Sequence, residues 1–104
     1  MEKKLTDSII KEINEIFGAK IRLGVMTILS MNDESDFSSL KKQLEVSDGN
    51  LGAHMNVLEK SGYIKVDKSF VNRRPKTSYK ITEKGRKAFL EHLTQLESII
   101  KKVK

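Results

Sequence analysis

The chain has 104 residues, of which 38% are hydrophobic, and it carries a net charge of +6. This length suits one modest hydrophobic core, so we expect residues 1–104 to form a single domain. The absence of cysteine excludes disulfides, zinc ribbons and thiol catalysis. We expect no signal peptide, and the most apolar segment, residues 23–29, is too short to span a bilayer. These features indicate a soluble protein.

The first predicted helix ends at Gly18, and a second one follows from about Ala19. Helical spacing in the first joins Leu5, Ile9, Ile10, Ile13, Ile16 and Phe17. The second helix has Ile21, Val25, Ile28 and Leu29 on one side and ends before the polar residues 32–35. Both helices therefore present an apolar stripe.

Two more helices are predicted on either side of a tight connection at residues 45–47. Asp36 is the expected N-cap of a short third helix, whose apolar face holds Phe37, Leu40 and Leu44. Ser47 is the expected N-cap of a fourth helix that turns Leu51, Met55 and Leu58 inward. Gly62 then stands at the usual position after a helix end.

The pattern then changes to the alternation of two β-strands. Ile64 and Val66 alternate with polar residues, and so do Tyr79 and Ile81. Residues 72–75 are expected to form the hairpin loop, because a proline cannot donate to a central ladder. Thr82 is the expected cap of a long last helix beginning at Glu83.

The positive charge coincides with this hairpin. Residues 60–80 hold seven bases and one acid, whereas the other residues hold 13 bases and 13 acids, so this window carries the whole charge of +6. Concentrated positive charge is typical of a surface that binds a polyanion. A solvated basic face that only maintains solubility is the alternative.

A short helix, a tight turn and a second helix can place the second helix in the major groove of DNA. The sequence resembles winged helix–turn–helix regulators, close to the MarR and ArsR families. Residues 37–64 match the phrase in which V-S opens the recognition helix and L-E-x-x-G-Y-I leads into the hairpin, or wing. Residues 79–86, Y-K-I-T-E-K-G-R, match the phrase after it, and the resemblance covers residues 19–90.

The resemblance implies a mainly α fold with a small β-hairpin, a winged helix–turn–helix with extra N- and C-terminal helices. It also implies a homodimeric transcriptional regulator that binds double-stranded DNA, with recognition helix 47–60 and wing 63–81. Such a protein is expected in the cytoplasm, associated with the nucleoid, and in a prokaryote.

The recognition helix is expected to contact bases through the side opposite Leu51. Asn50 and Asn56 carry paired donors and acceptors that suit adenine, although a solvated polar face is the alternative for each. The helix lacks a strong basic face, because residues 48–61 have a net charge of −1. We therefore expect modest base discrimination. The expected contacts are Ser47, Asp48, Gly49, Asn50, Gly52, Ala53, His54, Asn56 and Lys60.

Most affinity is expected from the wing and from the helix that braces the recognition helix. Arg73 and Arg74 at the loop tip can reach a minor groove or hold a phosphate. Serines near the start of the bracing helix can contact phosphate, and so can its lysines, unless they are merely solvated. The expected contacts are Ser38, Ser39, Lys41, Lys42, Lys65, Lys68, Arg73, Arg74, Lys76 and Lys80.

The terminal helices, residues 1–18 and 83–104, are expected to form the dimer interface. The last helix has apolar residues at spacings of four and three, which is a heptad seam. The alternative is that both helices pack on their own domain. The expected interface residues are Leu5, Ile9, Ile13, Ile16, Phe89, Leu93, Leu96, Ile100 and Val103.

The sequence disfavours an enzyme, because it has no Gly-rich phosphate loop, no H-E-x-x-H motif and no paired carboxylates in an apolar setting. We expect no cofactor and no metal, since His54 and His92 are isolated. No effector pocket is evident, so a small-molecule effector stays unknown. A winged-helix module that binds another protein is the main alternative function. An RNA-binding protein is less favoured, because no aromatic stacking platform accompanies the bases.

Overall fold

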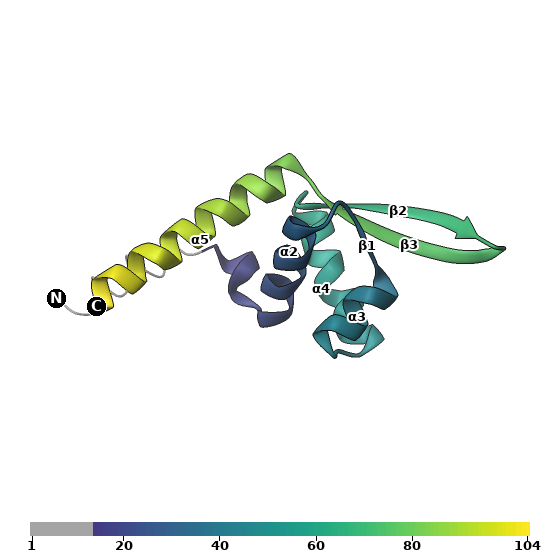
Figure 1. Ribbon diagram of the computed structural model, residues 1–104, viewed down its shortest axis with the longest axis horizontal. Coiled ribbons are helices and arrows are strands. Elements are labelled where there is room, and N and C mark those ends of the chain that lie inside the picture. Colours follow the sequence, from purple (N-terminus) through teal and green to yellow (C-terminus); the bar gives the residue numbers. More distant parts are fainter. Residues whose placement is uncertain (1–13) are drawn as a thin grey trace.

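The computed structural model describes residues 14–104. Its elements are a 3-10 helix η1 (Glu15–Gly18), α2 (Lys20–Met31), β1 (Ser35–Asp36), α3 (Phe37–Leu44), α4 (Asp48–Lys60), β2 (Ile64–Val71), β3 (Arg74–Ile81) and α5 (Glu83–Val103). Helices α2, α3 and α4 gather beside the sheet, the β2–β3 hairpin extends to one end and α5 extends to the other (Figure 1). The predicted winged helix–turn–helix fold is confirmed.

The core lies where α2, α3 and α4 meet. Side chains from these helices are fully buried because each helix turns its apolar stripe inward. The turn before β2, the strands and α5 close this core with Tyr63, Ile64, Tyr79 and Phe89. The fully buried helical side chains are Val25, Met26, Leu29, Leu40, Leu51 and Leu58.

The predicted N-caps all form. The Asp36 carboxylate accepts a hydrogen bond from the Ser39 backbone N–H at 2.7 Å. The Ser47 hydroxyl accepts from the Asn50 N–H at 3.2 Å, and the Thr82 hydroxyl accepts from the Gly85 N–H at 2.9 Å. Each cap satisfies a helix donor that has no partner within its helix. The starts of α3, α4 and α5 are therefore determined by side chains visible in the sequence.

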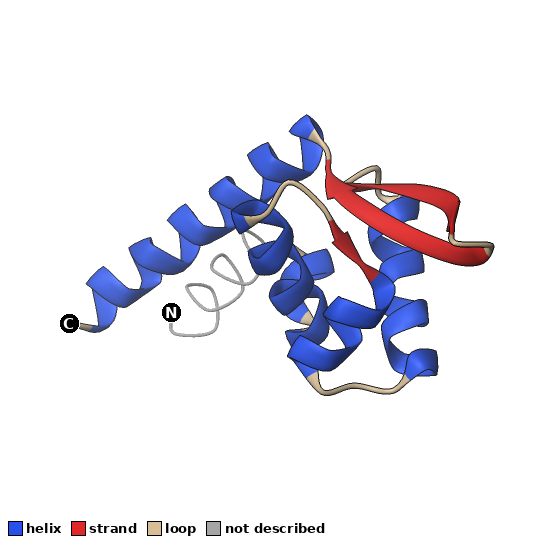
Figure 2. Cartoon of the chain, turned by 45° about the vertical axis from the view of Figure 1, so that its right-hand side comes forward, coloured by secondary structure: helices blue, strands red, loops and turns tan. Residues whose placement is uncertain are grey.

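The sheet has three strands, in the order β1-β3-β2, rather than the predicted two (Figure 2). The added strand β1 pairs antiparallel with β3, where Ser35 faces Tyr79 and Asp36 faces Ser78. Because β1 has only two residues, it leaves no alternating pattern in the sequence. It fixes the start of α3 against the base of the hairpin.

The predicted hairpin loop at residues 72–75 is too long. The strands pair up to Val71 and Arg74, so the turn consists of Asn72 and Arg73. Both have positive φ, 52° and 66°, as a tight hairpin turn of matching twist requires. Pro75 lies within β3 opposite Phe70. Pairs in an antiparallel hairpin alternate between bonded and non-bonded, and Pro75 falls in a non-bonded pair, where the ladder needs no N–H from it.

The prediction that the first helix continues through Phe17 is wrong. Asn14 has extended backbone angles, and its side chain accepts a hydrogen bond from the Ile16 N–H, so residues 15–18 form a separate 3-10 turn. The Phe17 ring is buried and stacks on Tyr63, with ring centroids 5.2 Å apart. Ile16 is half-buried against the same core. The predicted interface residues Leu5, Ile9 and Ile13 lie outside the described residues.

The first turns of α5 pack tightly on the rest of the chain. Gly85 is buried beside the Tyr63 backbone, and Phe89 meets the Phe17 ring edge-on at 5.5 Å. Phe89 is only 4% exposed, so its assignment to the dimer interface is wrong, because its ring fills the core of its own chain. His92 is the last buried residue of α5, and the remainder of the helix extends beyond the core (Figure 1).

Candidate nucleic-acid interface

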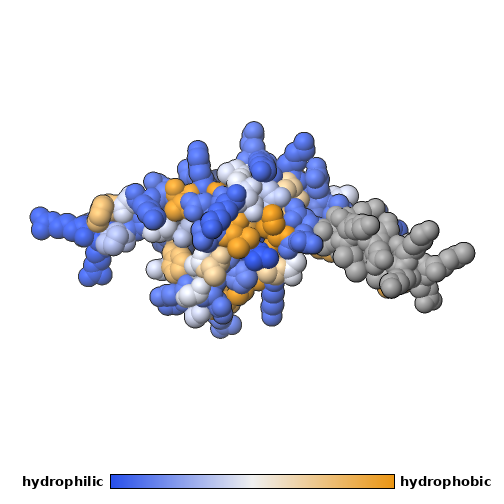
Figure 3. Space-filling model, turned by 180° about the vertical axis from the view of Figure 1, so that it is seen from behind, coloured by the Kyte–Doolittle hydropathy of each residue, from blue (hydrophilic) through white to orange (hydrophobic). Residues whose placement is uncertain are grey.

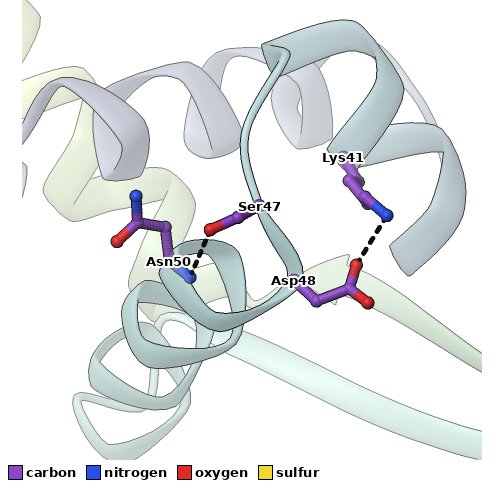
Figure 4. Close-up of polar contacts among 4 residues, drawn as sticks. All are labelled: Lys41, Ser47, Asp48 and Asn50. Atoms are coloured by element: carbon purple, nitrogen blue, oxygen red, sulfur yellow. Dashed lines mark hydrogen bonds and ion pairs between the residues drawn. The ribbon is translucent and has the colours of Figure 1, made fainter.

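Helix α4 presents its outer side to solvent. Leu51, Met55 and Leu58 hold its inner side in the core. The predicted recognition residues Gly49, Ala53, Asn56 and Lys60 are exposed on the other side. The Ser47 cap fixes the first turn, where Asn50 and Asp48 follow directly (Figure 4). The predicted helix at residues 47–60 is therefore present, and its side opposite Leu51 is exposed.

A hollow of about 620 Å³ separates α4 from the hairpin. Its α4 wall is made of small and polar residues, and its opposite wall comes from β2 and β3. Phe37 of α3 also lines it. The lining residues are Phe37, Gly52, Ala53, Met55, Asn56, Glu59, Val66, Lys68, Thr77 and Tyr79. Helix α4 and the hairpin thus border one shared concave surface.

The basic residues of the hairpin divide between its two faces. Side chains alternate along a strand, and paired residues share a face. Lys68 pairs with Thr77, and both line the hollow, so this face is turned towards α4. Lys65 pairs with Lys80 and Ser69 with Lys76, so these three lysines lie on the other face. All the predicted wing bases are exposed, but only Lys68 lies on the α4 side of the strands.

Arg73 forms the tip of the hairpin. It occupies the second turn position with φ 66°, and Arg74 begins β3 directly after it. Both residues are exposed. A left-handed conformation costs an L-residue about 1–2 kcal/mol relative to a right-handed one, and glycine is usually preferred here. Arg73 therefore occupies a turn position at which glycine would have the lower conformational cost.

His54 and Asn50 do not lie beside the hollow. Arg22 of α2 contacts the His54 ring, with Nη1 3.0 Å from Nδ1. Since Arg22 donates, His54 accepts at Nδ1 and carries its proton on Nε2. Asn50 is one helical turn before His54 and shares this flank of α4. His54 is thus directed towards α2, away from the wing.

Helix α3 braces α4 through an ion pair. Lys41 Nζ lies 2.8 Å from Asp48 Oδ1, across the turn between the two helices (Figure 4). Both side chains are largely exposed, so the pair adds little to stability. The Ser39 hydroxyl accepts a hydrogen bond from the Gln43 side chain, whereas Ser38 and Lys42 are exposed. Of the predicted bracing-helix contacts, Ser38 and Lys42 are the most accessible.

Glu59 contributes a carboxylate to the lining of the hollow, which also contains Tyr79. Burial raises the pKa of Tyr79, and the negative charge of Glu59 raises it further. The phenol therefore stays neutral and can donate a hydrogen bond. Neither residue was predicted to contribute to this surface, and nor were Phe37 and Thr77. The alternation of the strands was the available signal, because Thr77 and Tyr79 share the face of Lys68.

Within residues 14–104, no group of three or more His, Asp or Glu side chains is placed to hold a metal ion. Among the helices of this part of the chain, none is long and apolar enough to cross a bilayer.

The chain is similar in sequence and in structure to other proteins. An uncharacterised protein of Methanocaldococcus jannaschii is 34% identical over 89 residues, which cover 86% of this chain and 97% of that protein. The structure of a transcriptional regulator homologue from Pyrococcus horikoshii OT3 has a TM-score of 0.84 and 33% identity, with 99% and 98% of the two chains covered. Relative and neighbour both match over nearly their whole length.

More distant structures share the fold. The transcriptional regulator BldR from Sulfolobus solfataricus has a TM-score of 0.70 at 22% identity, covering 97% of this chain and 75% of its own. The neighbours described by function are transcriptional regulators and not enzymes. The family model described as winged helix DNA-binding domain matches residues 21–100. This chain therefore belongs to the winged helix DNA-binding domain family, and the resemblance inferred from its motifs is confirmed.

Proposed function

We propose that this protein is a homodimeric transcriptional regulator that binds double-stranded DNA. Helix α4 enters the major groove, and the β2–β3 hairpin contacts the flanking backbone and minor groove. One strand of the duplex occupies the hollow between α4 and the hairpin. The observation that carries this proposal is the shared concave surface of α4 and a hairpin with arginines at its tip.

The outer side of α4 supports close approach to a duplex. Gly49, Gly52 and Ala53 have small side chains, and a Cβ added at either glycine meets nothing within 4 Å. Asn56 lines the hollow and can pair with adenine in the major groove. Asp48 and Glu59 add negative charge, so α4 itself attracts phosphate weakly. Affinity then depends mainly on the hairpin, and base discrimination is modest.

Arg73 supports a role for the hairpin tip in binding an anion. Its left-handed conformation is compatible with glycine at lower conformational cost. Glycine would lose the charge, whereas an arginine in a minor groove gains from its strong negative potential. An arginine in place of glycine at this position therefore supports the proposal that the hairpin tip binds an anion.

The test is a salt titration of a duplex by fluorescence anisotropy. Replacing Arg73→Gly and Arg74→Gln together removes two charges and keeps the turn conformation available. We expect weaker binding, and we expect the slope of log affinity against log salt to fall by up to about 2, since each phosphate contact contributes about 0.9.

The matched control is Lys102→Gln with Lys104→Gln, which removes the same charge at the end of α5 farthest from the hairpin (Figure 1). This control should keep nearly the wild-type slope. Equal effects of both double variants would show that the hairpin arginines act only through the net charge of the protein, and not through contacts at the wing. A wild-type protein that does not bind any duplex in a salt-dependent manner would leave the protein-interaction module as the function.

For the dimer, the supporting observation is the exposed apolar surface on α5. Leu93, Ile100 and Val103 are 41%, 55% and 81% exposed, and they follow the predicted seam beyond His92. Leu96 is half-buried on the same side. Exposed apolar side chains in such a row mark an interaction surface. A second copy of α5 and of residues 1–18 would cover it.

Light scattering after size exclusion tests this dimer. Leu93→Glu with Ile100→Glu places charges in the seam and should give a monomer, because two carboxylates would be buried without partners. Ser98→Glu is the matched control, because Ser98 is exposed on the opposite side of the helix. A dimer that survives the double substitution, or is lost in the control, would contradict this interface.

A further inference from the structure

We propose that Phe70 contacts the deoxyribose surface of the bound DNA strand and adds an apolar, salt-independent contribution to affinity. This inference rests on the proposed function, and it assigns a binding residue that none of the sequence motifs indicated.

Phe70 is unusually exposed for a phenylalanine. It is 76% exposed near the end of the hairpin, and its neighbour Val71 is 47% exposed. In the view of Figure 3, a hydrophobic spot stands among hydrophilic side chains at the end of the hairpin. A lone aromatic ring on a charged hairpin has no packing role in its own chain. Its large apolar surface is available to a ligand.

The register of the sheet directs Phe70 to the same side as α4. Val66, Lys68 and Phe70 are every second residue of β2 and therefore share one face of the strand. Val66 and Lys68 line the hollow. Phe70 pairs with Pro75, so two apolar side chains extend this face beyond Lys68 and Thr77. From base to tip, this face of the hairpin therefore carries Val66 with Tyr79, then Lys68 with Thr77, and then, beyond the hollow, Phe70 with Pro75.

The charges around Phe70 select the occupant. Lys68 precedes it on the same face, and Arg73 and Arg74 follow at the tip, so a polyanion is the complementary partner. A DNA strand offers both parts of this pattern, because its phosphates are charged and its deoxyribose rings are apolar. A strand in the hollow, with phosphate at Lys68, places sugar against Phe70 and Pro75. A purely apolar partner would not match the surrounding bases.

This contact has a signature that separates it from the arginines. Phosphate contacts release counterions and make affinity depend on salt, whereas an apolar contact releases none. Removing the Phe70 ring should lower affinity by about tenfold at every salt concentration, as expected for an aromatic side chain that loses part of its buried area. The slope against log salt should stay at the wild-type value.

The experiment uses the full chain and one duplex, with anisotropy titrations over a range of salt concentrations. Phe70→Ala should bind about tenfold more weakly with the wild-type slope, and Phe70→Leu should retain most of the affinity. Val71→Ala is the matched control, because Val71 is an exposed apolar neighbour on the opposite face of the hairpin. It should bind like the wild type. Circular dichroism melting verifies that each variant is folded.

Three results would overturn the inference: Phe70→Ala binding as tightly as the wild type, a change in salt slope, or an equal loss in Val71→Ala. These results leave the proposed function intact, provided that the wild type binds the duplex and the arginine variant loses salt dependence. If the wild type does not bind DNA, the proposed function fails first.

Discussion

Gly85 is the position where a single methyl group should do the most damage. It lies in the first turn of α5, against the corner that follows α4. A Cβ at Gly85 would lie 2.1 Å from the Tyr63 carbonyl oxygen and 2.8 Å from its carbonyl carbon. These are backbone atoms, so no side-chain rotation relieves the overlap. The same oxygen accepts the Thr82 N–H at 3.0 Å, which limits how far the corner can move.

The cost of Gly85→Ala follows from this overlap. The methyl group must move by about 1 Å to reach an ordinary contact distance, and overpacking of this kind costs about 1–3 kcal/mol. We expect the free energy of unfolding to fall by about 2–3 kcal/mol, because the Cβ is fixed to the backbone of α5 and meets backbone atoms of Tyr63. For a domain of this size, that loss lowers the melting temperature by about 10–15 °C.

Gly52→Ala provides the matched control. It is the same substitution inside a helix, but nothing lies within 4 Å of the added Cβ. Alanine is favoured over glycine in a helix interior by about 0.5–1 kcal/mol, so this variant should be more stable than the wild type. Urea denaturation followed by circular dichroism, at one fixed protein concentration, measures both changes.

The two variants should therefore move the denaturation midpoint in opposite directions. A Gly85→Ala protein as stable as the wild type would refute the close approach of α5 to Tyr63. A destabilised Gly52→Ala protein would contradict the open space found around this position of α4.

Two further predictions concern α5. Burial lowers the pKa of His92, whose Nδ1 meets no hydrogen-bond partner among residues 14–104. The neutral ring therefore stabilises the fold above the unfolded pKa of about 6.5, and this stability is lost as pH falls below that value towards the folded pKa. Urea midpoints between neutral and mildly acidic pH should fall in the wild type and change less in His92→Leu; equal profiles would contradict this. Thr82→Ala removes an acceptor for Gly85 N–H and a donor to the Gly62 carbonyl, so it should cost about 1–2 kcal/mol. Thr82→Ser should retain most of that stability in the same assay, and a loss equal to that of alanine would assign the effect to the methyl group.

The helices were predictable because their signals are local. Asp36, Ser47 and Thr82 each cap a helix through a contact within three residues, so the sequence suffices to place the starts. Gly62 likewise adopts φ 78° immediately after α4. Such signals depend on no distant partner.

The errors arose where a local pattern has two tertiary outcomes. The spacing of Phe89 and Leu93 indicates one helical face, but it does not tell which residue packs on its own chain and which stays exposed. Pro75 was excluded from a strand by a rule for central positions, whereas its register leaves it without a required donor. The contact of His54 with Arg22 could not be predicted, because Arg22 is distant in sequence.

The candidate site was predictable in its parts and not in its assembly. The sequence identifies α4 and the basic hairpin, but which lysines face α4 depends on the strand register. One residue of shift in that register would exchange Lys68 for the lysines of the other face. The hollow between the two elements, and the place of Phe70 beside it, follow only from the folded arrangement.

The most direct test of the proposed binding mode uses the absence of cysteine, which makes any introduced thiol unique. An iron–EDTA cleavage reagent is attached to Ala53→Cys on the outer side of α4, and to Lys102→Cys at the end of α5 as a control. The bound DNA is a duplex selected from random sequence. We expect focused cleavage from position 53 at two places about one helical turn apart, and no focused cleavage from position 102. Diffuse cleavage from position 53, or the same pattern from both positions, would contradict it.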